Sequence, residues 1–257
     1  MKIATWNVNS LKVRLPHVLE WAQMATPDVI ALQETKLTDE NFPETDITDA
    51  GFHVVYAGQK TYNGVAILSR YELTDVVTDI PDLADPQRRI LAATTNGVRI
   101  IDLYVPNGAS LDSDKYPYKL NWLAKVTAFI QQQLQEYPEL VVLGDFNIAP
   151  ADDDVHDPTE WEGHVLVSPP EREALQGIMD LGLSDSFRLF EQPEKSFSWW
   201  DYRAAGFRRN RGLRIDHILV SEALKARCKA CIIDKEPRKW ERPSDHAPVL
   251  ADFASKT

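Results

Sequence analysis

Residues 140–147 have the sequence LVVLGDFN, in which four apolar residues run directly into a polar segment. The apolar run predicts a buried strand, so that Asp145 and Asn147 would lie just beyond its end. The same arrangement occurs in KIATWNVN, residues 2–9, where Asn7 and Asn9 follow a predicted strand. This short repeat suggests two related halves whose strand ends face one shared cleft.

Short apolar runs bounded by turn residues occur throughout the chain and predict many strands. The predicted strands are Lys2–Trp6, Val29–Leu32, Val54–Ala57, Val65–Ser69, Ile90–Thr94, Arg99–Val105, Leu140–Leu143, Ile215–Val220, Cys231–Asp234 and Val249–Phe253. Helical spacing and turn residues predict helices over Arg14–Met24, Lys115–Glu136 and Ala174–Leu181. Many strands with few helices between them favour an α/β fold of two sheets packed face to face, with helices outside.

Size and composition favour one domain over residues 1–257. The chain is 44% hydrophobic, enough for a sizeable core, and it has no low-complexity linker. No apolar run approaches the about 20 residues that a membrane span needs. The start of the chain, MKIATWNVNSL, also lacks the pattern of a signal peptide. We therefore expect a cytoplasmic monomer without membrane association.

The charge is acidic overall but basic in one segment. A net charge of −11 argues against a protein that coats nucleic acid by bulk attraction. Between Arg203 and Arg214, however, the chain has five arginines and no acidic residue, and Arg208, Arg209 and Arg211 are among them. The segment is either a solvated loop or a patch that binds phosphates.

Polar residues gather at the ends of predicted strands in four clusters. Taken one at a time, they have ordinary explanations such as an Asx turn or a solvated acid. Taken together, they combine carboxylates, amides and one histidine, a set that suits a hard cation and lacks the several His or Cys ligands of a zinc site. The clusters are Asn7 with Asn9, Glu34, Asp145 with Asn147, and Asp216 with Asp245 and His246.

This set of residues suits the hydrolysis of a phosphodiester. A magnesium ion neutralises charge that develops on the phosphate, and it typically takes only one or two protein carboxylates. An acid then orients or deprotonates water, and a cationic group stabilises the transition state. We expect Mg²⁺ as the cofactor, with Mn²⁺ able to replace it.

The motifs that contain these residues resemble those of the exonuclease III family of abasic-site endonucleases, in the endonuclease/exonuclease/phosphatase superfamily that includes DNase I. The shared motifs are WNVNSL (6–11), LQETK (32–36), GDFNIAP (144–150), LRIDHIL (213–219) and SDHAPV (244–249). Further motifs are similar to the bacterial branch: YVPNG (104–108), KYPYKL (115–120), SPPER (168–172) and FSWWDY (197–202). The resemblance implies a four-layer α/β sandwich.

The resemblance also implies a substrate and roles for individual residues. The substrate would be double-stranded DNA with an abasic site or a damaged 3′ end. The metal would be bound by Glu34, with Asn9 and Asp245 close to it. Asp145 would position or activate the attacking water, and Asn7 and Asn147 would orient that acid or the phosphate. Tyr104 would contact the scissile phosphate. His246 would donate to a phosphate oxygen, and Asp216 would hold its ring. Asn107 would contact the phosphate, and Trp199 would line a pocket for the abasic sugar.

The chain departs from some eukaryotic relatives at two of these positions. Those relatives have an acid at the position of Asn9 and a tryptophan at that of Leu213. The first difference leaves open the number of metal ligands. Leu213 would still contact the substrate, and the second difference leaves open how tightly the pocket grips a sugar.

Two segments beside these motifs have alternative interpretations. The aromatics of FSWWDY run into the arginine segment, which favours a DNA cleft over a simple core cluster. His164 would lie, by the resemblance, on a loop beside the DNA. There it either narrows the space for a distorted duplex, which favours 3′ termini, or is an ordinary surface residue.

Two other functions compete with DNA repair. One is a phosphatase of a small phosphorylated molecule on the same scaffold, and the other is a catalytically inactive DNA-binding module. The arginine segment argues against the first, and the presence of all the expected acids and the histidine argues against the second. The pair Cys228 and Cys231 has no further zinc ligands at matching spacing, so we expect two reduced, partly buried thiols.

Overall fold

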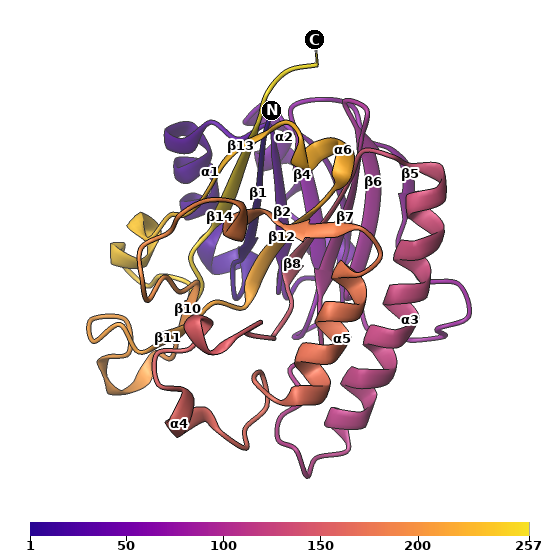
Figure 1. Cartoon of the computed structure of the whole chain (residues 1–257). Coiled ribbons are helices and arrows are strands. Elements are labelled where there is room, and N and C mark those ends of the chain that lie inside the picture. Colours follow the sequence, from indigo (N-terminus) through magenta and orange to yellow (C-terminus); the bar gives the residue numbers. More distant parts are fainter. Residues whose placement is uncertain (257) are drawn as a thin grey trace.

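Two six-stranded sheets pack face to face in the computed structural model, which describes residues 1–256 (Figure 1). Thr257, the last residue of the predicted domain, lies outside the described residues. The first sheet has the strand order β13-β14-β1-β2-β4-β3, and the second has the order β5-β6-β7-β8-β12-β9. A two-stranded ribbon, β10-β11, lies apart from them.

The strands have the following bounds. The first sheet contains β1 (Lys2–Asn7), β2 (Val29–Gln33), β3 (His53–Ala57), β4 (Val65–Ser69), β13 (Cys228–Ile233) and β14 (Val249–Phe253). The second contains β5 (Thr74–Val77), β6 (Ile90–Thr95), β7 (Val98–Tyr104), β8 (Leu140–Asp145), β9 (Leu183–Asp185) and β12 (Asp216–Ser221). The ribbon consists of β10 (Trp199–Trp200) and β11 (Gly212–Leu213).

Helices cover the outer face of each sheet and complete four layers. Helix α1 (Leu11–Ala25) packs Val18 and Trp21 on the first sheet, and α3 (Lys115–Glu136) and α5 (Pro169–Met179) cover the second. A separate apolar cluster fills the space between the sheets, with Val29 and Val141 among its members. The shorter helices are α2 (Glu44–Asp49), α4 (Pro158–Trp161) and α6 (Glu222–Lys225). The predicted four-layer α/β sandwich is confirmed.

Each sheet contains one parallel pair of central strands. β1 runs parallel to β2, and β7 runs parallel to β8, whereas the other pairs are antiparallel. The carboxyl ends of parallel neighbours lie at the same edge of a sheet. Asn7 and Gln33 are therefore register partners at one such edge, and Tyr104 and Asp145 are partners at the other. This is the arrangement that the two similar motifs predicted.

Two predicted helices begin earlier in the structure than the sequence indicated. Helix α1 starts at Leu11 rather than Arg14, because the N–H groups of Ser10 and Leu11 donate to the carbonyls of Glu34 and Thr35, at 2.8 and 3.0 Å. Helix α5 spans Pro169–Met179, so the prediction of Ala174–Leu181 was wrong about both ends. Its start is a capping box that apolar spacing does not detect.

Several short elements were not predicted at all. Strands β5 and β9 have only four and three residues, and β10 and β11 have two each. Such lengths carry too little apolar periodicity to be recognised. Among residues 1–256, no helix combines the length and the apolar character that crossing a membrane requires.

Gly144 is the residue at which the second sheet allows no side chain. Its φ is +140°, and a Cβ atom there would lie 1.9 Å from the Leu103 carbonyl oxygen on the neighbouring strand β7. We expect Gly144→Ala to lower the free energy of unfolding by at least about 2 kcal/mol through overlap and backbone strain. Urea denaturation of the purified variant measures this loss.

Gly177→Ala is the matched control. Gly177 lies inside α5, and a Cβ atom there would meet no neighbouring atom within 4 Å. An alanine there should raise stability by about 0.5–1 kcal/mol, since glycine is unfavourable inside helices. Equal urea midpoints for the two variants would contradict the assignment of Gly144 as a point of contact between β7 and β8.

Candidate active site

The strand ends of both sheets open into one cavity of about 430 Å³. Glu34 follows β2, while Tyr104 and Asp145 end β7 and β8. Asp216, the first residue of β12, pairs in register with Asp145, and His246 comes shortly before β14. Glu34, Tyr104, Asp145 and His246 all line the cavity. The structure thus brings together residues that are far apart in the sequence.

Asn7 links the two acids of the site. Its side-chain Nδ2 donates to Glu34 Oε2 at 2.7 Å and to Asp145 Oδ2 at 2.9 Å. Asn7 is fully buried and Asp145 nearly so, whereas about a fifth of the Glu34 side chain is exposed, at 20%. The other oxygen of Asp145 accepts from the backbone N–H of Asn147 at 2.9 Å. Asp145 is therefore held at both oxygens, while Oε1 of the cavity-lining Glu34 lies 3.7 Å from Lys36 Nζ.

His246 is held in a chain of buried polar groups. Its Nδ1 lies 2.8 Å from Asp216 Oδ2, and the same oxygen accepts from the Ser198 hydroxyl at 2.7 Å. The Ser198 oxygen in turn accepts from the N–H groups of Ile215 and Asp216, at 3.0 and 3.1 Å. The ring orientation is therefore fixed, with Nε2 lying 3.7 Å from Asp145 Oδ2.

The surroundings favour the charged form of His246. Burial alone would lower the pKa of its imidazole, but the carboxylates of Asp216 and Asp145 outweigh burial and raise the pKa to about 10. Burial also raises the pKa of Asp145, to about 7, against the opposing charge of His246. Burial and the nearby Glu34 and Asp145 charges raise the pKa of Tyr104, which keeps its hydroxyl protonated.

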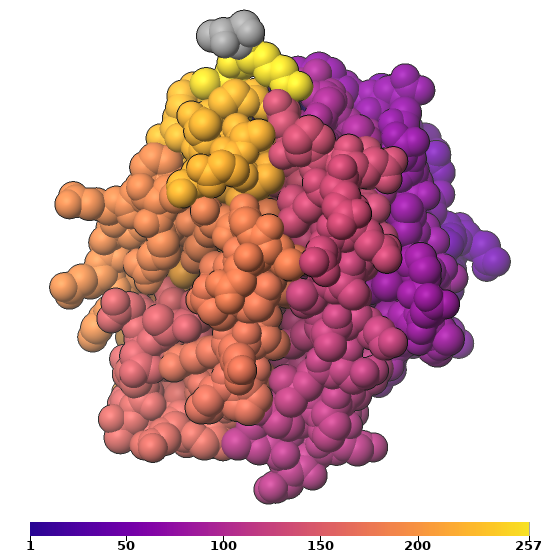
Figure 2. Space-filling model, turned by 45° about the vertical axis from the view of Figure 1, so that its right-hand side comes forward, coloured from indigo at the N-terminus to yellow at the C-terminus, as the bar shows by residue number. Residues whose placement is uncertain are grey.

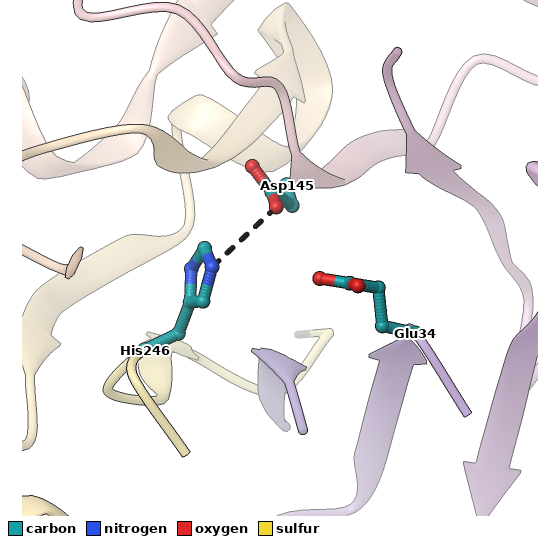
Figure 3. Close-up of side chains that lie close together, drawn as sticks. All are labelled: Glu34, Asp145 and His246. Atoms are coloured by element: carbon teal, nitrogen blue, oxygen red, sulfur yellow. Dashed lines mark ion pairs between the residues drawn. The ribbon is translucent and has the colours of Figure 1, made fainter. Parts of the chain in front are cut away.

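Glu34, Asp145 and His246 form the group with metal-binding potential (Figure 3). One ligand atom from each lies within 4.8 Å of the others. Figure 3 shows the three side chains converging on one space, with the ion pair of Asp145 and His246 on one side and Glu34 opposite. Two carboxylates in this position suit a hard divalent cation.

The comparisons with known proteins agree with this site. Residues 4–246 match the Endonuclease/Exonuclease/phosphatase family. Exodeoxyribonuclease III of Haemophilus influenzae is 40% identical over 98% of this chain and 100% of its own length. The chain belongs to the exonuclease III/AP endonuclease family. The resemblance inferred from the sequence motifs is confirmed.

Solved structures of related proteins show how closely the fold agrees. A 3′ phosphatase from Neisseria, solved with a product DNA hairpin, shares 50% identity at a TM-score of 0.98, with 99% of this chain and 100% of that chain covered. An AP endonuclease from Archaeoglobus fulgidus shares 39% identity at a TM-score of 0.96, covering 99% and 100%. The family therefore contains, at this level of similarity, both 3′-end and abasic-site enzymes.

In this exonuclease III family protein, the other two residues expected near the metal interact mainly with neighbouring side chains. Asn9 Oδ1 accepts from Lys36 Nζ at 2.6 Å, and its Nδ2 donates to Asp245 Oδ1 at 3.2 Å. The second oxygen of Asp245 accepts from Trp199 Nε1 at 3.0 Å. Asp245 lines the cavity, whereas Asn9 does not. Their role as metal ligands stays a prediction.

The residues expected to contact the phosphate form a second group. Asn107 Nδ2 donates to Asn147 Oδ1 at 3.3 Å, and Asn147 Nδ2 donates to the Val105 carbonyl at 2.9 Å. Asn107 is exposed, Asn147 is buried, and both line the cavity beside Tyr104. The exposed amide of Asn107 thus lies at the cavity, and its contact with a phosphate stays a prediction.

Three rings form the rim of the cavity on the other side. Trp161 lies edge-on to both Trp199 and His164, with ring centroids 6.4 and 5.8 Å apart. His164 is exposed and lines the cavity. Leu213, expected to contact the substrate, is instead fully buried in a small apolar cluster with Ile215. It packs with Trp199, its register partner on β10.

The arginine segment divides into structural and available side chains. Arg214 is buried and pairs with Asp154 and Asp185, each at 2.7 Å, and Arg211 pairs with Glu160. Arg208 and Arg209 are exposed. The light-orange segment that contains them projects from the left side of the molecule in Figure 2. The fifth arginine, Arg203, lines the cavity, is also exposed and pairs with the neighbouring Asp201 at 2.7 Å. Arg203, Arg208 and Arg209 therefore remain as candidate DNA contacts.

Sequence reasoning missed Ser198, whose hydroxyl holds Asp216. It lies inside the FSWWDY motif, which we interpreted through its aromatic residues alone. Cys228 and Cys231 lie on β13 as free thiols, half-buried and buried, and burial raises the pKa of both. Cys228 fits the expectation of a partly buried thiol, whereas Cys231 is buried more deeply than expected.

His246 and Asp216 give the first test of the site. We expect His246→Asn to lower kcat roughly 100- to 1,000-fold, as the loss of one transition-state donor does. Asp216→Asn should lower kcat less, because it acts through the imidazole. Single-turnover rates on DNA with a 3′ phosphate measure both, with folding checked by circular dichroism. A folded His246→Asn variant with near-normal turnover would remove His246 from the catalytic group.

Proposed function

We propose that this protein is a metal-dependent DNA repair phosphodiesterase that uses Mg²⁺ and acts mainly on damaged 3′ termini of double-stranded DNA. The observation that carries the proposal is the convergence of Glu34, Asp145 and His246 on one cavity, tied together by Asn7. The family contains abasic-site and 3′-end enzymes with the same fold. The protein would act in the cytoplasm as a monomer.

The donor set fits a magnesium ion. Glu34 offers a partly exposed carboxylate, and the Asp145 carboxylate lies within reach on the opposite sheet. A bound Mg²⁺ would neutralise charge on the phosphate and on the leaving oxygen. His246 belongs to the same group geometrically, but its pair with Asp216 favours an imidazolium, which donates hydrogen bonds and has no lone pair for a metal.

The chain's own groups divide the chemistry among them. Asp145, fixed by Asn7 and by the Asn147 N–H, is placed to orient the attacking water and take its proton. His246, held by Asp216, donates to a phosphate oxygen as negative charge develops there. Asn107 and the protonated hydroxyl of Tyr104 bind the phosphate from the other side.

The metal assignment predicts a specific loss. Glu34→Gln keeps the shape of the side chain and removes its charge, so hydrolysis should fall by several orders of magnitude. EDTA should abolish wild-type activity, and Mg²⁺ or Mn²⁺ should restore it. The measurement is cleavage of a labelled duplex panel that contains an internal abasic site, a 3′-phosphate nick and an intact 3′ end. Full activity in EDTA would overturn the assignment.

His164 supports the preference for 3′ termini. An internal abasic site must be turned out of the helix into a pocket, at a cost of a few kcal/mol, whereas a 3′ end is already free. His164 and Trp161 line the cavity with their rings in contact, and there they would narrow the space through which such a distorted duplex has to enter. The Neisseria relative with 50% identity is a 3′ phosphatase.

His164→Gly tests this preference. The substitution should raise the rate of abasic-site cleavage relative to 3′-phosphate removal, because the rim becomes wider. His53→Gly, at an exposed histidine on β3, serves as the control and should leave the ratio unchanged. Both rates are measured on one duplex panel. An unchanged ratio in His164→Gly would mean that another feature sets lesion choice.

A further inference from the structure

Lys119 is a fully buried lysine in the second turn of α3, next to the two loops that carry the active-site amides. Its Nζ donates to the backbone carbonyl of Asn147 at 2.7 Å and to that of Asn107 at 3.2 Å. Its third contact is a very short ion pair with Glu171, which is also fully buried. One ammonium group therefore contacts both loops that carry the phosphate-facing amides.

The contacts account for every polar group of the pair. An ammonium has three N–H donors, and Lys119 meets three acceptors, whereas a neutral amine would have only two hydrogens to give. Glu171 Oε1 also accepts from Leu166 N–H at 3.0 Å, and its Oε2 accepts from the N–H and hydroxyl of Ser168, at 3.1 and 2.5 Å. The pair is fully hydrogen-bonded although it is buried.

The pair also joins two helices. Lys119 lies at the start of α3 and Glu171 at the start of α5, and the two helices lie side by side in Figures 1 and 2. Gly108 makes room for the lysine, since a Cβ there would lie 3.3 Å from Lys119 Cδ and its φ is +94°. Leu166 and Ser168 belong to the segment that follows His164. The same buried ion pair therefore contacts both the segment that follows the rim residue His164 and the two loops that carry the amides.

We propose that Lys119, with Glu171 as its partner, is a positioning residue that sets the separation and orientation of the Asn107 and Asn147 amides toward the scissile phosphate. This rests on the proposed function, in which those amides face the phosphate. Replacement of such a buried ion pair by apolar residues is often neutral or stabilising, so stability alone does not explain it. What the pair supplies is fixed hydrogen bonds to two carbonyls whose residues line the active-site cavity.

Lys119→Met removes the charge and keeps most of the stem. We expect kcat for 3′-phosphate removal to fall about 100-fold, as displacement of positioning groups does. KM should change less than about threefold, because the exposed DNA contacts are intact. Arg99→Met is the matched control: Arg99 is a buried cation on β7 that contacts Gln133, at the strand end opposite Tyr104. It should lose stability and keep kcat within about threefold.

The double variant Lys119→Met with Glu171→Gln separates positioning from stability. The glutamine has no unpaired buried charge and keeps an acceptor for the Leu166 and Ser168 N–H groups, so the urea midpoint should rise above that of Lys119→Met. The value of kcat should stay low, because no ammonium donates to the two carbonyls. Recovery of kcat together with stability would overturn the proposal. Wild-type protein that fails to cleave the DNA would instead refute the proposed function.

A double-mutant cycle between Lys119 and the two amide residues tests the proposal independently if the double variant does not fold. In a background of Asn107→Ala with Asn147→Ala, Lys119→Met should cost less than about threefold in kcat, since the groups it positions are gone. A loss of about 100-fold in that background, equal to the loss in wild type, would mean that Lys119 acts on something else.

Discussion

The Asn7 amide nitrogen is the point at which the two sheets are joined in the active site. It donates to Glu34, which follows a strand of the first sheet, and to Asp145, which ends a strand of the second. Neither sheet contains the site by itself. The carboxylates can lie this close because a neutral amide satisfies one oxygen of each, and because the parallel pairs β1–β2 and β7–β8 place their carboxyl ends at this edge. The apolar cluster between the sheets holds them together, and the Asn7 contacts align their acids at this edge.

The sequence indicated the strands and the acids well, because both have local signatures. Apolar runs predicted most central strands, and the polar residues that follow them were the ones that met at the cavity. Long-range contacts had no such signature. The Lys119–Glu171 pair spans 52 residues, and no periodicity relates its members. The start of α1 depends on carbonyls of the loop after β2, and Leu213 is buried because β10 and β11 pair across its backbone.

Charge shows the same dependence on tertiary structure. Five arginines in twelve residues predicted one basic segment, yet two of them are neutralised by acids from elsewhere in the chain. Arg214 holds the loop after β8 to β12 through Asp154, a structural task. An acidic protein of net charge −11 would thus face DNA with a few exposed arginines and the cation of its own cleft.

The buried polar contacts behind the cavity have a common consequence for specificity. Ser198 fixes Asp216 and thereby His246, and Lys119 fixes the segments of Asn107 and Asn147. Groups held this way have little freedom to adjust to the shape of a lesion. In the proposed function, lesion choice is therefore set where the structure is exposed, at the rim. His164 and Trp161 lie there, with one face toward the cavity and none of the buried bonds that restrain the catalytic groups. In the proposed function, a fixed centre with lesion choice set at the rim would allow abasic-site and 3′-end enzymes to share one fold.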